Sequence, residues 1–262
     1  MAERQERKAA FELIDGIILV PGAIKDTSGY FAIDTGAVQT VLNRIYCASA
    51  PGSEIKEALT FNGGMKPSDI STGSAEKISV AGWEITLSSA LTMDMDYVER
   101  PLRKGRDDLV FLGSIGADIL GTGLLLIDYP NKQLDFCVSK IPEHAKRVKM
   151  IIEKLPTVEL EIQQRTFRFV MDTGANHFVM DREAVPMGAI VASSDKDAPQ
   201  MLKSLHFAGR EYRNITGMTA DLSAVRDKLQ AQVDGIIGYQ LLKEYLCCFD
   251  YKNEWLYLAP QC

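Results

Sequence analysis

The chain has 262 residues, a formal net charge of −6 from 29 basic and 35 acidic side chains, and a hydrophobic content of 46%. This is the composition of an ordinary globular protein, long enough for one large domain or two of average size. No block of lysine or arginine interrupts the mild acidity, so we do not expect nucleic acid as a partner.

The N-terminal residues bear on location. Residues 1–10, MAERQERKAA, are strongly charged, and the first apolar run, residues 16–24, is short and contains Pro21. These features disfavour a signal peptide and a membrane span, so we expect no membrane partner and a cytoplasmic protein, or a periplasmic or secreted one if a leader has been removed. The five cysteines form no C-x-x-C pair, which predicts free thiols and no metal site.

After a disordered tail at residues 1–10, the first half of the chain, residues 11–140, is expected to consist mostly of strands. Its short runs of β-branched and aromatic residues are bounded by Gly, Pro, Asn or Asp, which is typical of strands joined by turns. Residues 109–120 are compatible with a strand or a helix. The predicted strands are GIILV, YFAID, EKISV, EITLS, LLLID and QLDFC.

A polar stretch that begins near a proline, residues 141–152, is expected to link this half to the second half, residues 153–262. The second half repeats the strand pattern, and its residues 222–233 and 239–246 favour helices. The sequences DYPNK and DYKNE predict tight hairpin turns. The predicted strands are TVELEI, FRFVMD, LKSLHF, EYRNITG, CCFDY and EWLYL.

The two halves share an internal repeat. The segment FAIDTGAVQTVL, residues 31–42, corresponds to FVMDTGANHFVM, residues 169–180. Further blocks match in the same order: VAGWEI with FAGREY, ADILG with DGIIG, and IDYPNKQLDF with FDYKNEWLYL. The offset between copies falls from 172 − 34 = 138 to 250 − 128 = 122, so the second copy is shorter between its blocks. This pattern predicts a duplication whose length differences lie in loops.

A repeated Asp-Thr-Gly sequence can supply the chemistry of amide hydrolysis. Hydrolysis without a metal needs a general base for the water and a general acid for the amide. Two carboxyl groups about 3 Å apart can do both, because their repulsion prevents both from ionising and one proton is shared. The candidates are Asp34 and Asp172, each after an apolar strand.

The neighbouring residues fit that role. The hydroxyls of Thr35 and Thr173 can bond across the two copies and fix the loops. Gly36 and Gly174 allow backbone N–H groups to approach the carboxylates without an intervening Cβ. An alternative is that Asp-Thr-Gly is a turn retained in both copies without chemistry.

These motifs resemble the clan of pepsin-like and retroviral-type (retropepsin-like) aspartic peptidases, in which an apolar-apolar-Gly segment threads beneath each Asp-Thr-Gly loop. We match this segment to residues 119–121 and 236–238. The resemblance covers approximately residues 12–140 and 153–259, and the C-terminal part is especially like the bacterial, retropepsin-like type.

The resemblance implies a mainly β fold with two similar retropepsin-like or pepsin-like β-barrel lobes related by a pseudo-twofold axis. It also implies an aspartic endopeptidase that uses Asp34 and Asp172, needs no cofactor, and acts on peptide or protein substrates. Retroviral enzymes need two chains, whereas both aspartates here lie on one chain. We therefore expect a monomer in which the two lobes pair within the molecule.

Two details refine this expectation. Ala37 and Ala175 stand where pepsin-like enzymes carry a hydroxyl that stabilises the ionised dyad, which predicts raised pKa values and a weakly acidic to neutral optimum. Gly63 and Gly64 lie where the family's glycine-rich flap closes over substrate, although an ordinary hairpin would look the same. The alternatives to a peptidase are a non-catalytic peptide-binding protein and an assembly module whose halves pair between chains.

Overall fold

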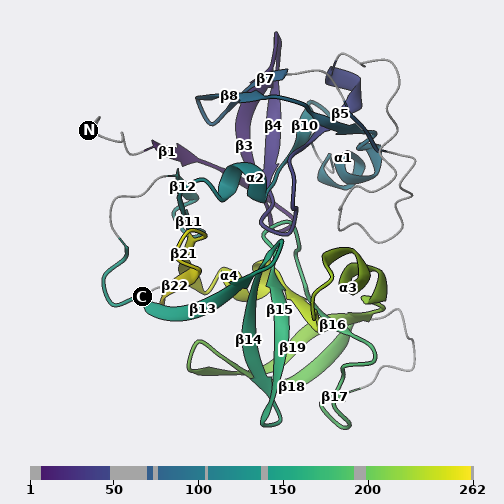
Figure 1. Cartoon of the computed structure of the whole chain (residues 1–262), viewed down its shortest axis with the longest axis vertical. Coiled ribbons are helices and arrows are strands. Elements are labelled where there is room, and N and C mark those ends of the chain that lie inside the picture. Colours follow the sequence, from purple (N-terminus) through teal and green to yellow (C-terminus); the bar gives the residue numbers. More distant parts are fainter. Residues whose placement is uncertain are drawn as a thin grey trace.

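The computed structural model describes residues 7–47, 70–72, 76–103, 106–136, 141–191 and 199–260 (Figure 1). Strands make up 53% and helices 12% of it, so the expected mainly β fold is confirmed. Within these residues no helix is long and apolar enough to span a membrane.

The described residues of the first half form a nine-stranded sheet, drawn in the upper part of Figure 1. Its strands, in spatial order, are β6 (Ile70–Thr72), β9 (Leu91–Met93), β5 (Val41–Asn43), β10 (Phe111–Ile115), β4 (Thr27–Ile33), β3 (Ile17–Ile24), β7 (Glu76–Val80) and β8 (Trp83–Leu87), with β2 (Glu12–Ile14) paired to β3. The helices are the 3-10 turn η1 (Arg44–Tyr46), α1 (Asp96–Leu102) and α2 (Ala117–Leu120).

A thirteen-stranded sheet contains the second half and the junction between the halves. Its order is β1 (Arg7–Ala10), β12 (Gln133–Phe136), β11 (Leu124–Asp128), β21 (Tyr245–Asp250), β22 (Trp255–Pro260), β13 (Lys146–Ile152), β14 (Pro156–Ile162), β15 (Arg165–Met171), β20 (Gly235–Ile237), β16 (Phe178–Asp181), β19 (Arg210–Ala220), β18 (Gln200–Phe207) and β17 (Ile190–Val191). An additional pairing of β14 with β18 closes the second half into a barrel. The helices of this half are α3 (Ser223–Leu229) and α4 (Tyr239–Leu242).

The halves meet through β11 and β21, which pair antiparallel and lie between the two lobes in Figure 1. Leu126 of β11 faces Cys248 of β21, and 248 − 126 = 122 is also the interval that separates Asp128 from Asp250. A twofold rotation about the Leu126–Cys248 pair therefore exchanges the two strands. The junction is a pseudo-symmetric sheet whose outer strands are β1 and β13.

These outer strands correct two expectations. Residues 7–10 were expected to belong to a disordered tail, but they form β1 and pair with β12. Residues 146–152 were expected to be linker, but they form β13 and pair with β22 and β14. Both strands carry charged residues, which a strand outside the hydrophobic interior tolerates, so their composition resembles that of a tail or linker.

The cores explain why the strands take this arrangement. The residues before Asp34 and Asp172 are apolar and buried, as in Phe31 and Ile33 of β4 and Phe169 and Met171 of β15. One cluster of buried side chains includes all four and continues into β11 and β21, so the two lobes share a core beneath their junction. Smaller clusters fill each lobe separately.

Candidate active site

The two Asp-Thr-Gly loops begin where β4 and β15 end. In each half the neighbouring strand, β10 or β20, runs parallel to the aspartate's strand and antiparallel to the strand that follows the loop, β5 or β16. The amide of Asp34 donates to the carbonyl of Ile115 at 3.0 Å, and that of Asp172 donates to the carbonyl of Ile237 at 2.9 Å. The strand register therefore fixes both aspartates in equivalent positions.

This register corrects one matched motif. Residues 119–121 were expected to thread beneath the first loop, but Ala117–Leu120 is helix α2. The threading strand is β10, and its last residue Ile115 and the following Gly116 correspond to Ile237 and Gly238, since 238 − 116 = 122. The apolar spacing of the two candidate segments is similar, and only the strand pairing distinguishes them.

The threonines join the two loops. The amide of Thr35 donates to Oγ1 of Thr173 at 3.0 Å, and the amide of Thr173 donates to Oγ1 of Thr35 at 3.0 Å. Each hydroxyl in turn donates to a carbonyl of the opposite strand at 2.6 Å, Thr35 to Met171 and Thr173 to Ile33. Both threonines are fully buried, so the four bonds lie out of competition with water and hold the loops in one arrangement.

The glycines bring the carboxyl groups into the centre. The amide of Gly36 donates to Oδ1 of Asp34 at 3.0 Å, and that of Gly174 donates to Oδ1 of Asp172 at 2.7 Å. A Cβ atom on Gly36 would overlap the carboxyl carbon of Asp172, and one on Gly174 would lie 2.7 Å from that of Asp34. Each carboxyl group therefore lies against the glycine of the opposite loop.

Burial and proximity change how the pair ionises. Burial, the charge of Asp172 and a hydrogen bond to Asp172 together raise the pKa of Asp34 well above its usual range. Burial also raises the pKa of Asp172, against the opposing effect of backbone N–H donors and of the bond from Asp34. The two carboxyl groups therefore titrate together as one coupled pair that shares a proton.

A cavity of about 190 Å³ opens beside the dyad. Apart from the two aspartates, its walls are mainly apolar and come from both halves and from the segment before α1. The lining residues are Ala37, Val41, Met93, Met95, Ser114, Gly174, Ala175 and Ile236. The site can thus take up an apolar group next to the carboxyl pair.

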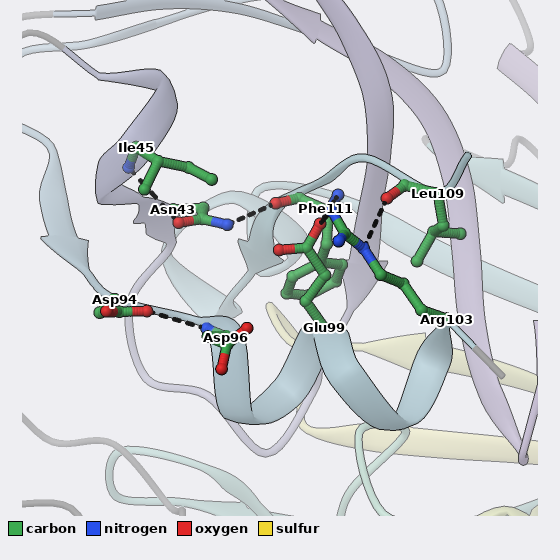
Figure 2. Close-up of polar contacts among 8 residues, drawn as sticks. All are labelled: Asn43, Ile45, Asp94, Asp96, Glu99, Arg103, Leu109 and Phe111. Carbon is green, nitrogen blue, oxygen red and sulfur yellow. Dashed lines mark hydrogen bonds and ion pairs between the residues drawn. The ribbon is translucent and has the colours of Figure 1, made fainter. Parts of the chain in front are cut away.

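A network on the first half fixes the strands that flank the loop (Figure 2). Glu99 of α1 is buried and accepts from Arg103 at 2.7 Å and from the amide of Phe111 at 3.3 Å. Asn43, at the end of β5, donates to the carbonyl of Phe111 at 2.9 Å, and Arg103 donates to the carbonyl of Leu109 at 3.2 Å. Helix α1 is thereby joined to the start of β10 and the end of β5.

The second half has a corresponding network that is built from different side chains. Asp181, at the end of β16, forms an ion pair with Arg226 of α3 at 3.0 Å and accepts from the amides of Leu222 at 2.8 Å and Glu183 at 2.9 Å. Arg226 also donates to the carbonyl of Val233 at 3.3 Å. The network again joins the helix to the strands around the Asp-Thr-Gly loop.

These supporting residues were not anticipated from the sequence. Asn43 and Asp181 occupy matching positions, 43 − 34 = 9 and 181 − 172 = 9 residues after their aspartates, which is a signal that the repeat contains. Gly63 and Gly64, proposed for the flap, lie outside the described residues. Within the described part of the chain, no group of three or more His, Cys, Asp or Glu side chains is placed to hold a metal ion.

Comparison with known proteins bears on the fold. No protein-family model and no curated protein sequence matches this chain. Among solved structures it is similar to the aspartic proteinase from Irpex lacteus, with a TM-score of 0.60, 13% sequence identity, and coverage of 98% of this chain and 97% of that chain. A likeness at this identity identifies architecture. The chain has the mainly β, bilobed fold of the pepsin-like aspartic proteinases.

Proposed function

We propose that this chain is an aspartic endopeptidase that hydrolyses peptide bonds with Asp34 and Asp172. One observation carries the proposal: the cross-bonded threonines hold the two loops so that each carboxyl group lies against the glycine of the opposite loop. A turn retained without chemistry would have no need to bring the buried Asp172 carboxyl group against the half-buried Asp34, since their mutual repulsion and desolvation cost free energy.

The proposed reaction follows from the shared proton. The ionised carboxylate of the pair accepts a proton from a water molecule as the water oxygen attacks the peptide carbonyl carbon. The protonated carboxyl group donates its proton to the carbonyl oxygen, which gives a neutral tetrahedral diol. The carboxyl group that took the proton from water then gives it to the amide nitrogen as the C–N bond breaks. The other carboxylate takes a proton from a diol hydroxyl, so the products are a carboxylic acid and an amine and the pair again holds one proton.

The cavity supports a preference among substrates. Its walls are mainly apolar, and Met93 and Met95 have flexible side chains that can adapt to different shapes. We propose a peptide bound in extended form, with an apolar residue next to the cleaved bond. The raised pKa of Asp34 supports a weakly acidic to neutral optimum, because one carboxyl group then stays protonated into that range.

The finer classification is also a proposal. We propose a single-chain, internally duplicated relative of the retropepsin-like type that acts in the cytoplasm as a monomer. The supporting observations are the matched Asp-Thr-Gly blocks and the pairing of β11 with β21 within one chain. Activity per molecule that fell on dilution, together with a dimer in sedimentation, would contradict the monomer.

The test is cleavage of a peptide library across the weakly acidic and neutral range, with and without pepstatin. We expect pepstatin-sensitive cleavage, and we expect Asp34→Asn and Asp172→Asn to lower kcat by about 10³-fold or more. Asp26→Asn, at an exposed turn, is the matched control and should leave kcat unchanged. Binding of peptides without cleavage by the unaltered protein would favour the non-catalytic peptide-binding alternative.

A further inference from the structure

Two tyrosines occupy equivalent positions next to the central strands. Tyr129 follows β11 and Tyr251 follows β21, and 251 − 129 = 122 is the interval that relates the two strands. Each begins a turn of the same form, in which an asparagine donates through its amide and side chain to the preceding aspartate. The two tyrosine rings therefore occupy positions related by the pseudo-twofold symmetry of the two strands.

Both hydroxyl groups are buried and have no hydrogen-bond partner among the residues that the structure describes. A buried O–H group without a partner loses the hydrogen bonds that it makes to water in the unfolded chain, and native proteins rarely leave such a group unsatisfied. Two of them at symmetric positions therefore call for a structural explanation.

Each tyrosine packs against the opposite half. The ring of Tyr129 lies 5.4 Å, between centroids, from Tyr239 at the start of α4, and Tyr239 donates its amide to Ala175 of the second catalytic loop at 2.8 Å. Tyr251 lies beside Gly121 at the end of α2, where a Cβ would be 3.6 Å from its ring. The tyrosine of each half therefore lies close to the helix that follows the other half's threading strand.

The charges around the hydroxyls agree with that placement. Burial, then the charges of Asp34 and Asp172, raise the pKa of Tyr251 far above its usual range. Burial, then Cys247, Asp172 and Tyr239, raise the pKa of Tyr129. Both tyrosines stay protonated, so each presents an O–H donor to the electric field of the dyad.

We propose that Tyr129 and Tyr251 are positioning residues of the dyad, each holding an internal water molecule with its hydroxyl behind the catalytic loop of the opposite half. Such a water accepts a hydrogen bond from the buried hydroxyl. Its own O–H groups then point toward the carboxyl pair, and their positive ends favour the ionised form of the pair. The water sites stand independently, whereas their effect on the reaction rests on the proposed function.

The first test is stability. If each hydroxyl binds water, Tyr129→Phe and Tyr251→Phe remove a satisfied hydrogen bond and should lower Tm by about 2 to 4 °C each. Tyr212→Phe, which removes a hydroxyl bonded to Tyr245, gives the size of such a loss as a positive control. An unchanged or higher Tm in both test variants would overturn the water sites, because removing an unsatisfied hydroxyl is neutral or stabilising. A crystal structure with no water oxygen within hydrogen-bond distance of either hydroxyl would do the same.

The second test is the pH profile of kcat/KM. Loss of a water that stabilises the ionised dyad raises its pKa, so the acidic limb should move to higher pH by about half a unit in Tyr251→Phe and Tyr129→Phe. Tyr212→Phe should leave the limb in place. An unmoved limb in the two test variants would overturn the positioning role. Absence of cleavage by the unaltered protein, with the waters present, would instead refute the proposed function.

Discussion

The two Asp-Thr-Gly loops are held by the same backbone bonds but by different side chains. Besides the bonds to Ile115 and Ile237, the amide of Ala117 donates to Ala37 at 2.8 Å and the amide of Tyr239 donates to Ala175 at 2.8 Å. Behind the loops, the buried acid lies on helix α1 in the first half, as Glu99, and on strand β16 in the second, as Asp181. The backbone geometry is thus common to both halves, while several side-chain solutions can support it.

The largest expected effect tests whether the two Asp-Thr-Gly loops contribute equally to stability. Thr35→Val and Thr173→Val each remove a hydroxyl that donates to one buried carbonyl and accepts from one buried amide. Each should lower the free energy of unfolding by about 2 to 4 kcal/mol, whereas the Ser variants keep the bonds and should lose about 1 kcal/mol or less. Urea unfolding measures this, and a clear inequality between the two Val variants would break the comparison.

The helix-to-strand networks should respond unequally. Without Arg226, three backbone amides still bind Asp181; without Arg103, one still binds Glu99, which is only 5% exposed. The amides are those of Leu222, Glu183 and Ala184 on Asp181, and of Phe111 on Glu99. We expect Arg103→Met to cost about 2 to 3 kcal/mol and Arg226→Met about 1 to 2 kcal/mol of unfolding free energy. If chemical denaturation showed a larger loss for Arg226→Met than for Arg103→Met, the number of remaining amide donors would not explain the difference between the two networks.

The dyad should give the protein a pH-dependent stability that both halves share. Its carboxyl groups have higher pKa values in the folded state than in the unfolded chain. Their contribution to the free energy of unfolding is therefore complete below about pH 4, the pKa of an unfolded aspartate, and is lost as the pH rises through the pKa of the folded state. Asparagine does not ionise. Asp34→Asn and Asp172→Asn should therefore gain stability relative to the unaltered protein between acid and neutral pH. Tm curves that run parallel across this range would contradict it.

The smallest expected effect concerns the residue six positions after each aspartate. Thr40 donates its hydroxyl to Asp118 at 2.7 Å and accepts from the buried amide of Gly116 at 3.1 Å, whereas the amide of the matching Phe178 donates to the side chain of Gln240 at the longer distance of 3.5 Å. Thr40→Val should cost about 1 kcal/mol and Gln240→Ala less than about 0.5 kcal/mol. Equal losses in thermal unfolding would mean that these contacts do not distinguish the halves.

Local sequence patterns were sufficient for much of the fold. Alternating and apolar runs such as YFAID and TVELEI predicted β4 and β14, because burial on a sheet requires them. The turns after β11 and β21 were predicted from DYPNK and DYKNE, and Asp128 and Asp250 do accept from the asparagines of these turns. The repeat pointed to the two aspartates because the proposed chemistry needs the same residues twice.

The same local patterns could not predict which strands pair over long distances in the sequence. The sequence around Ile115 and that around residue 119 have similar apolar spacing, and only pairing with β4 selects the former. Strands β1 and β13 look like tail and linker because their stability comes from β12 and β22 rather than from their own composition. Helix α1 contains Pro101 and opens with acidic residues, so it gives no clear apolar periodicity.

Two buried cysteines at the junction of the lobes can report how often the molecule opens. Cys247 and Cys248 are adjacent in β21, point to opposite faces of the central sheet, and are both 0% exposed. Burial raises the pKa of Cys248 to about 12 and that of Cys247 still further, so neither forms a reactive thiolate while β21 stays paired with β11. Alkylation of the peptide that carries them, followed by mass spectrometry, therefore records how often the lobes come apart.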